Sequence, residues 1–147
     1  MSHAPRNPLD AMHRPATISL RTSLFEDAVA IVENEYASDL SLDDIARRVA
    51  SSRRQLQRAY SEIGETTFRE HLTAVRMDRA AELLRIRGLT VRDVAHRVGY
   101  RQPAQFAKAF RRYQGVAPSD FRAGTRPEGS SQRSGGGRFA RPAYRVA

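Results

Sequence analysis

Two short stretches of this sequence place hydrogen-bonding side chains at the spacing of a single helix face. In residues 53–63 the positions i, i+3, i+4 and i+7 are polar: Arg54, Gln57, Arg58 and Ser61. In residues 103–114 the matching outward face holds Ala104, Gln105, Lys108, Arg111 and Arg112. Arginine can donate two parallel hydrogen bonds to guanine, and glutamine can exchange two with adenine. Such faces can therefore read base edges or hold phosphates, although the same pattern also suits a solvated helix face.

Polar groups also lie at the start of each of these predicted helices. Arg53 is as well placed to contact a phosphate as a base. Arg101 and Gln102 precede the second helix, where backbone N–H groups can hold a phosphate as well. The helix starts expected after Ser41 and Thr90 could serve in the same way.

The elements that position these side chains form a unit that is written twice between Ser41 and Arg122. The first copy reads SLDDIARRVASSRRQLQRAY and the second TVRDVAHRVGYRQPAQFAKAF. Each opens with a hydroxyl residue and an Asp three positions later, and closes on a large apolar residue and an aromatic one four positions later. The pairs are Ser41 and Asp44, Thr90 and Asp93, Leu56 and Tyr60, and Phe106 and Phe110. Corresponding residues of the two copies are 49 residues apart at the start and 50 apart at the aromatic positions. A repeat of this length is typical of a supersecondary unit.

Small residues occur at the same two places in both copies. Ala46 and Ala95 fall where the two helices of each copy must approach closely. Ala50 and Gly99 fall in the turn, where a large side chain would clash. These matched positions predict a helix-turn-helix in each copy, with the basic helix second.

Apolar spacing predicts an all-α fold of about seven helices. The predicted ranges are 24–36, 42–49, 53–63, about 67–87, 91–98, about 103–114, and a last turn after Pro118 that docks Phe121. Ser41 with Asp44 and Thr90 with Asp93 predict capping boxes, and Gly64 and Gly88 are interpreted as helix stop signals.

The domain organisation follows from these ranges. We interpret residues 1–23 as a flexible N-terminal arm, 24–122 as the folded domain and 123–147 as a disordered Gly/Ser/Arg-rich tail. The folded part divides into three segments: a first helix-turn-helix at about 41–64, a linker helix at about 67–87, and a second helix-turn-helix at about 90–114.

Charge is polarised along the chain, whose net charge is +9. Residues 22–46 contain seven acidic and no basic side chains, whereas residues 47–122 contain 17 basic and seven acidic ones. Because 24 of the 25 basic residues are Arg, compositional bias explains part of the preference for Arg over Lys, but not where the charge lies. Positive charge over both second helices is typical of a polyanion binder.

The predicted linker helix has a length that matters for DNA. Its 21 residues would span about 31 Å at a rise of ~1.5 Å per residue. Successive major grooves on one face of B-DNA lie ~34 Å apart. One chain could therefore dock two readers in adjacent grooves; the alternative is a connecting helix whose length is accidental.

Over about residues 24–122 the chain resembles the DNA-binding domain of the AraC/XylS family of transcriptional regulators. The most specific stretch is TVRDVAHRVGYRQPAQFAKAFRRYQGVAPSDFR. The residues that match the family pattern there are Ala95, Gly99, Tyr100, Phe106, Lys108, Phe110, Arg111, Gly115, Pro118, Phe121 and Arg122. The resemblance implies two helix-turn-helix subdomains joined by a long helix, and sequence-specific binding to double-stranded DNA at promoter sites.

Family position points to Arg54, Gln57 and Arg58 as base contacts of the first reading helix. On the second, the candidates for base contacts are Gln105 and Lys108, whereas Arg111 and Arg112 are expected to contact phosphates. Pro103 and Ala104 replace polar side chains that relatives often carry, so readout by this helix is expected to be weaker or more hydrophobic.

The resemblance to short, stand-alone members implies a monomer on an asymmetric site, without a small-molecule effector domain. We expect the acidic first helix to face away from DNA, where it could contact RNA polymerase or another protein. The lack of a membrane span or secretory signal favours the cytoplasm, in association with the nucleoid.

Enzymatic and metal chemistry find no support in the sequence. The chain has no Cys, and its four His residues show no ligand spacing. Asp43 and Asp44 fall at a helix start, where dipole and capping roles explain them. We therefore expect no cofactor, no metal and no catalytic site, and the missing Cys excludes a DNA-repair methyltransferase. The remaining alternatives are an architectural, largely non-specific DNA binder and a protein-interaction module.

Overall fold

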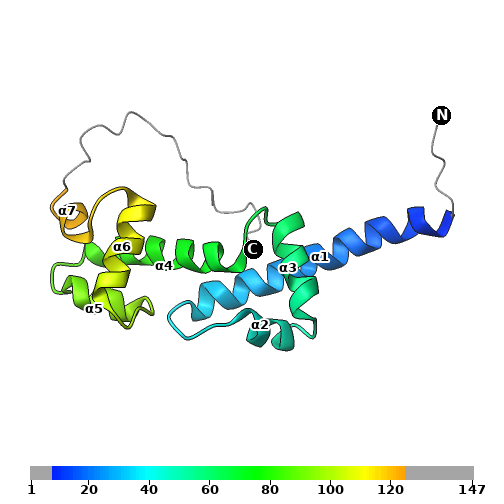
Figure 1. The fold of residues 1–147 in the computed structure, drawn as a ribbon, viewed down its shortest axis with the longest axis horizontal. Helices are drawn as coiled ribbons and strands as arrows, with labels where there is room; N and C mark the ends of the chain where they lie inside the picture. The colour runs from blue at the N-terminus through cyan, green and yellow to red at the C-terminus, as the bar shows by residue number, and fades with distance from the viewer. Residues whose placement is uncertain (1–7, 125–147) are drawn as a thin grey trace. The chain divides into compact units, whose positions relative to one another are not determined.

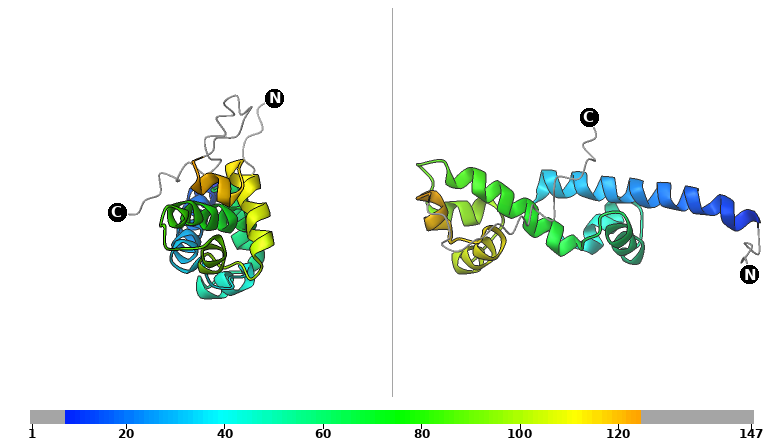
Figure 2. Two further views of the ribbon diagram at one scale, coloured as in Figure 1. Left: turned by 90° about the vertical axis from the view of Figure 1, so that its left-hand side faces the viewer. Right: turned by 90° about the horizontal axis from the view of Figure 1, so that it is seen from above.

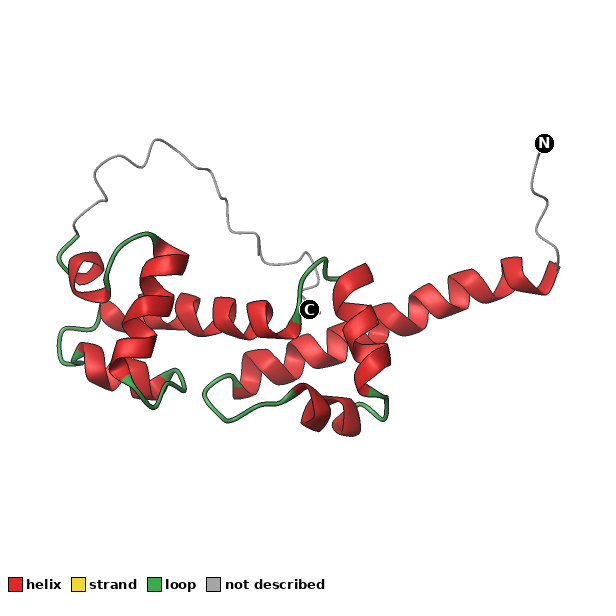
Figure 3. Ribbon diagram, in the orientation of Figure 1, coloured by secondary structure: helices red, strands yellow, loops and turns green. Residues whose placement is uncertain are grey.

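The computed structural model describes the backbone of residues 8–124 and the side chains of residues 17–124. Within this range the chain is all-α, as predicted, and Figure 3 shows only helices and loops there. The helices, labelled in Figure 1, are α1 (Pro8–Glu35), α2 (Leu42–Arg48), α3 (Arg53–Glu62), α4 (Phe68–Leu84), α5 (Val91–Arg97), α6 (Pro103–Gln114) and α7 (Pro118–Arg122). Most of the tail predicted over 123–147 lies outside the described residues. No helix in the described part of the chain is long and apolar enough to cross a membrane.

The chain forms two compact units. The described part of the first unit comprises residues up to Ile31 together with Ser41–Phe68, so it contains α2 and α3. The second unit comprises Val32–Leu40 together with the chain from Arg69 onward, so it contains α5, α6 and α7. The last turn of α1 thus belongs to the second unit. In the sequence, the first helix-turn-helix lies between the two segments that form the second unit.

The core of the first unit is built on aromatic contacts between α1, α3 and the start of α4. The ring of Tyr60 meets Phe25 edge-on at 5.2 Å and Phe68 at 6.1 Å, measured between ring centroids. Gly64 follows α3 because a Cβ there would lie 2.5 Å from the Phe25 ring. The predicted stop signal therefore reflects lack of space at Gly64.

The core of the second unit lies where α4, α5 and α6 meet (Figure 2). Its fully buried members are Met77, Ala80, Leu84, Val94, Ala95, Val98, Phe106 and Phe110. The ring of Phe121 packs edge-on against Phe110 at a centroid distance of 5.3 Å, so α7 docks through Phe121 as predicted. Arg122 adds a hydrogen bond from its Nε to the carbonyl oxygen of Leu84, 3.0 Å away.

The turns of the two helix-turn-helix copies have the same backbone pattern. Ala50 and Gly99 both adopt positive φ, 54° and 97°, which favours a residue with little or no side chain. The next amide in each copy donates to the carbonyl of the buried alanine: Ser51 to Ala46 at 2.8 Å and Tyr100 to Ala95 at 2.9 Å. The small residues predicted at both places are confirmed, and left-handed backbone is the main reason for those in the turn.

Side chains cap the starts of α2 and α5, as predicted, but the capping box predicted at both is complete only at α5. Thr90 and Asp93 form a complete capping box, and hydrogen bonds from Thr90 hold the pKa of the Asp93 carboxyl below its usual value. The Ser41 hydroxyl accepts the Asp44 amide and donates to the Asp44 carboxylate, 2.8 Å away. The hydrogen bond from Ser41 is the largest cause that lowers the pKa of the Asp44 carboxyl, and the hydrogen bond from Arg47 is the second.

Two predicted helix bounds are wrong. The first helix begins at Pro8 rather than near residue 24, so most of the expected flexible arm is helical. The sequence does not indicate this extension, because Ile18 and Leu20 are exposed and Pro15, inside its range, disfavours a helix.

The linker helix, α4, ends at Leu84, which makes it 17 residues or about 26 Å at ~1.5 Å per residue instead of 21 residues. Leu84 is the last fully buried residue before the chain bends, and Ile86 is half exposed. Beyond Leu84 the amides of Arg85 and Ile86 bond three residues back, and a further turn from the amide of Leu89 to the carbonyl of Ile86 encloses Gly88. Gly88 therefore lies in a turn beyond the helix and is not its stop signal as predicted.

Candidate nucleic-acid interface

The predicted first reading helix, α3, buries one side and exposes the other. Leu56, Ala59 and Tyr60 are buried in the core of the first unit. The exposed side carries all four residues of the predicted face: Arg54, Gln57, Arg58 and Ser61. Ser52 fixes the start of this face, because its hydroxyl accepts the amide of Gln55 at 3.2 Å. Ser52 is the N-cap of α3, a role that the sequence pattern did not indicate.

Arg53 differs from the other candidates because it already has a partner. Its Nη1 lies 3.1 Å from Oδ2 of Asp43, which is in the first turn of α2. Both side chains are more than half exposed, at 59% and 61%. The neighbouring carboxylate, Asp44, pairs with Arg47. The two acidic residues of α2 thus each hold an arginine, an arrangement that the predicted capping and dipole roles did not include.

The second reading helix, α6, follows the same division of faces. Phe106 and Phe110 point into the core of the second unit. The predicted outward residues are all exposed: Ala104, Gln105, Lys108, Arg111 and Arg112. Gln102 occupies the capping position without a side-chain hydrogen bond, and Pro103 follows it in the first turn. Arg101 and Gln102 are exposed just before the helix.

The predicted contact side chains, Arg53 apart, are available to a ligand. Within residues 17–124 none of the other ten forms a side-chain hydrogen bond or an ion pair with the rest of the chain. Burial on the opposite face of α3 and of α6 fixes the direction in which they point. Each helix-turn-helix therefore presents one face of unengaged hydrogen-bonding groups.

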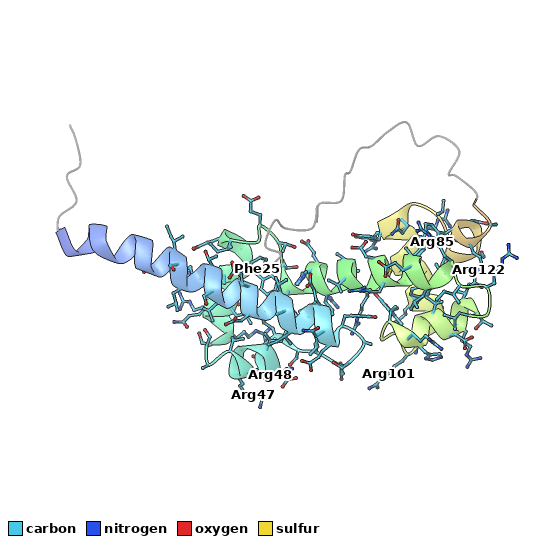
Figure 4. The ribbon with its side chains drawn as sticks, turned by 180° about the vertical axis from the view of Figure 1, so that it is seen from behind. Phe25, Arg47, Arg48, Arg85, Arg101 and Arg122 are labelled. Atoms are coloured by element: carbon cyan, nitrogen blue, oxygen red, sulfur yellow. The ribbon has the colours of Figure 1, made fainter. Side chains whose placement is uncertain are left out.

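The two helix-turn-helix copies differ in charge. Residues 41–64 contain five basic and three acidic side chains, whereas residues 90–114 contain six basic and one acidic. Basic residues outside the predicted set add to this charge. Arg47 and Arg48 extend from the end of α2, and Arg101, itself a member of the predicted set, extends from the turn before α6 (Figure 4). Arg92 and Arg97 are likewise exposed on α5.

The histidines of the described part do not form a binding site. His71 is buried on α4, and burial lowers its pKa from 6.5 to about 4. His96 is exposed on α5. No group of three or more His, Cys, Asp or Glu side chains suited to a metal occurs within the part of the chain that the structure describes.

Comparison with known proteins agrees with this geometry. A family model described as a helix-turn-helix domain matches residues 45–124, which is more than half of the chain. The chain belongs to the AraC/XylS family of transcriptional regulators. The matched range contains α3 and both helices of the second copy. This is a family of DNA-binding regulators rather than of enzymes.

Several curated family members are similar in sequence. The Msm operon regulatory protein of Streptococcus mutans is 33% identical over 92 residues, which cover 63% of this chain and 33% of that protein. An uncharacterised HTH-type transcriptional regulator of Mycobacterium tuberculosis is 36% identical over 108 residues, which cover 74% of this chain and 29% of that protein. This chain spans about a third of the length of these relatives.

Solved structures of the family share the fold. An AraC-type regulator from Chromobacterium violaceum superposes with a TM-score of 0.66 at 27% identity, covering 73% of this chain and 96% of that one. The DNA-binding domain of AdpA, solved in complex with a target DNA, gives a TM-score of 0.62 at 28% identity, covering 69% and 90%. The similarity is therefore to DNA-binding domains of the family.

Proposed function

We propose that this chain is a sequence-specific regulator of transcription that binds double-stranded DNA as a monomer and places α3 and α6 in adjacent major grooves. The observation that carries the proposal is the repeated face of unengaged donors, on the second helix of each of two helix-turn-helix copies with matching turns. Membership of the AraC/XylS family supports it.

The side chains would divide between base readout and positioning. On α3, Arg54 and Arg58 would donate to guanine edges, and Gln57 would both donate to and accept from an adenine edge. Lys108 and Gln105 would take this role on α6. Charged residues nearer the ends of the face would hold phosphates and so fix the register: Arg101, Arg111 and Arg112.

The two copies would contribute differently to affinity. Because residues 90–114 carry a larger excess of positive charge, the second copy should supply more of the salt-dependent binding. The first copy has a richer set of candidate base contacts and two carboxylates that offset its arginines. Asp27 and Glu33, exposed on α1, would repel phosphates, so we assign α1 to contact with RNA polymerase or another protein.

The test is selection of bound duplexes from a random library, followed by footprinting of the full chain on the enriched site. We expect an enriched asymmetric site with protection over two adjacent major grooves, and altered transcription from a promoter that contains it. Protection of a single groove would refute tandem docking. Failure to enrich any site would favour the architectural, non-specific alternative.

A further inference from the structure

Arg76, on α4, joins three segments of the second unit through its guanidinium group. Its Nε donates to the carbonyl oxygen of Tyr36 at 2.8 Å, and its Nη2 donates to that of Ser38 at 3.0 Å. Its Cζ lies 5.6 Å from the centre of the Tyr100 ring, a cation–π contact. One half-buried side chain thus holds the turn after α1 and the turn between α5 and α6.

The turn of the second helix-turn-helix lies directly against this group. A Cβ on Gly99 would be 3.0 Å from the Arg76 Nη2 and 3.0 Å from the carbonyl oxygen of Ala37. A side chain at this position would therefore push the turn off α4. Because Gly99 packs so closely against the Arg76 guanidinium, the distance between this turn and α4 depends on Arg76.

Tyr100 carries this contact to the reading helix. Its ring meets Phe106 edge-on at a centroid distance of 5.7 Å, and Phe106 is the first fully buried residue of α6. Burial is the main influence on both partners of the cation–π contact: it lowers the pKa of Arg76 and raises that of Tyr100.

We propose that Arg76 is a positioning residue for α6, and that it sets the base preference of the second helix-turn-helix without touching DNA. This inference rests on the proposed function. A lysine keeps the charge at this site but has neither the planar fork that reaches two divergent carbonyls nor a flat face for the Tyr100 ring. Base readout requires donors to be placed within a fraction of an ångström, so a tilt of α6 would be felt at its base contacts first.

The experiment compares DNA selection by the full chain with that of Arg76→Lys and Arg76→Gln. The wild type must first enrich a site with two separate parts; if it enriches none, the proposed function fails before any variant is judged. Both Arg76 variants should then keep the preference in the part read by α3. In the part read by α6 their discrimination between bases should fall by about tenfold.

Arg122→Gln is the matched control. Arg122 also donates from its Nε to a backbone carbonyl of the second unit, at 3.0 Å, and Arg122→Gln removes one positive charge just as Arg76→Gln does. Within residues 17–124, Arg122 makes no hydrogen bond and no ring contact with the turn at Gly99 and Tyr100. It should lower stability while leaving both parts of the preference unchanged.

A second readout separates positioning from general loss of stability. Amide hydrogen exchange should speed up in Arg76→Lys mainly at residues 36–40 and 98–102. A uniform increase across the second unit, or an equal loss of preference in both parts of the site, would overturn the proposal.

If both Arg76 variants unfold, two substitutions of Tyr100 test the same proposal. Tyr100→Leu removes the ring but keeps the two carbonyl hydrogen bonds, and it should reproduce the loss of preference at the part read by α6. Tyr100→Phe keeps the ring over the guanidinium and should retain that preference. Equal behaviour of the two variants would contradict the role given to Arg76.

Discussion

Asp43→Asn should raise the affinity of this protein for any duplex DNA, because it releases Arg53. The carboxylate and the guanidinium are 3.1 Å apart and mostly exposed, so the ion pair is worth at most about 1 kcal/mol. A phosphate that binds Arg53 must first break this pair. Removing the carboxylate should therefore increase affinity by up to about fivefold, the factor that corresponds to ~1 kcal/mol.

The dependence on salt gives a sharper measurement than affinity at one condition. One additional phosphate contact should steepen the slope of log affinity against log salt by ~0.9. The variant and the wild type should therefore differ most at low salt and converge as the ionic strength rises. Fluorescence anisotropy on a scrambled duplex at several salt concentrations would measure both quantities, and the selected site should show an unchanged preference for bases.

Asp120→Asn controls for the general change in charge. Asp120 is also in the first turn of a helix, α7, and within the described residues it forms no ion pair. Its removal should raise affinity only slightly and leave the salt slope nearly unchanged. Equal effects of the two substitutions would show that net charge, and not the release of Arg53, is responsible. A salt slope unaffected by Asp43→Asn would remove Arg53 from the phosphate contacts.

Three further outcomes are expected. Arg58→Ala should cost ~1–3 kcal/mol and relax preference at one base position, whereas Arg112→Ala should weaken binding to all sequences and reduce the salt slope by ~1; selection and salt titration distinguish them. Gly99→Ala should lower the free energy of unfolding by roughly 2 kcal/mol, measured by urea denaturation, because φ is +97° and the Cβ would meet a backbone carbonyl at 3.0 Å. Burial lowers the pKa of His71 from 6.5 to about 4. Between pH 6.5 and 4 this imidazole is therefore protonated in the unfolded chain and neutral in the folded chain. Stability should fall by up to about 3 kcal/mol as the pH drops through this window, and His71→Gln, but not the exposed His96→Gln, should flatten this dependence.

Local sequence rules predicted the reading helices well. The range 103–114 for α6 is confirmed, because Pro103 favours a helix start and Gly115, with φ of +84°, ends the helix. The exposed faces of α3 and α6 followed from helical periodicity alone, since their opposite faces are strongly apolar. Their contacts with DNA stay predictions.

The features that sequence reasoning missed depend on contacts between distant parts of the chain. Asp43 and Arg53 are ten residues apart and meet only because the helix-turn-helix folds back. Arg76 bonds to backbone carbonyls 38 and 40 residues away, and a carbonyl leaves no trace in the residue types. The length of α4 was overestimated because Gly88 was interpreted as its stop signal, whereas the helix ends at Leu84, its last fully buried residue.

The division of α1 between the two units has a consequence for dissecting the domain. The second unit draws on Val32–Leu40 as well as on the chain from Arg69 onward, so the first helix-turn-helix is an insertion within it. Closing the second unit requires the chain to return across this insertion, a non-local step that slows folding more than it weakens the folded state. The two helix-turn-helix copies are therefore not interchangeable modules. A fragment that began at Phe68 would contain both α5 and α6 and still lack Tyr36, part of the surface on which they rest.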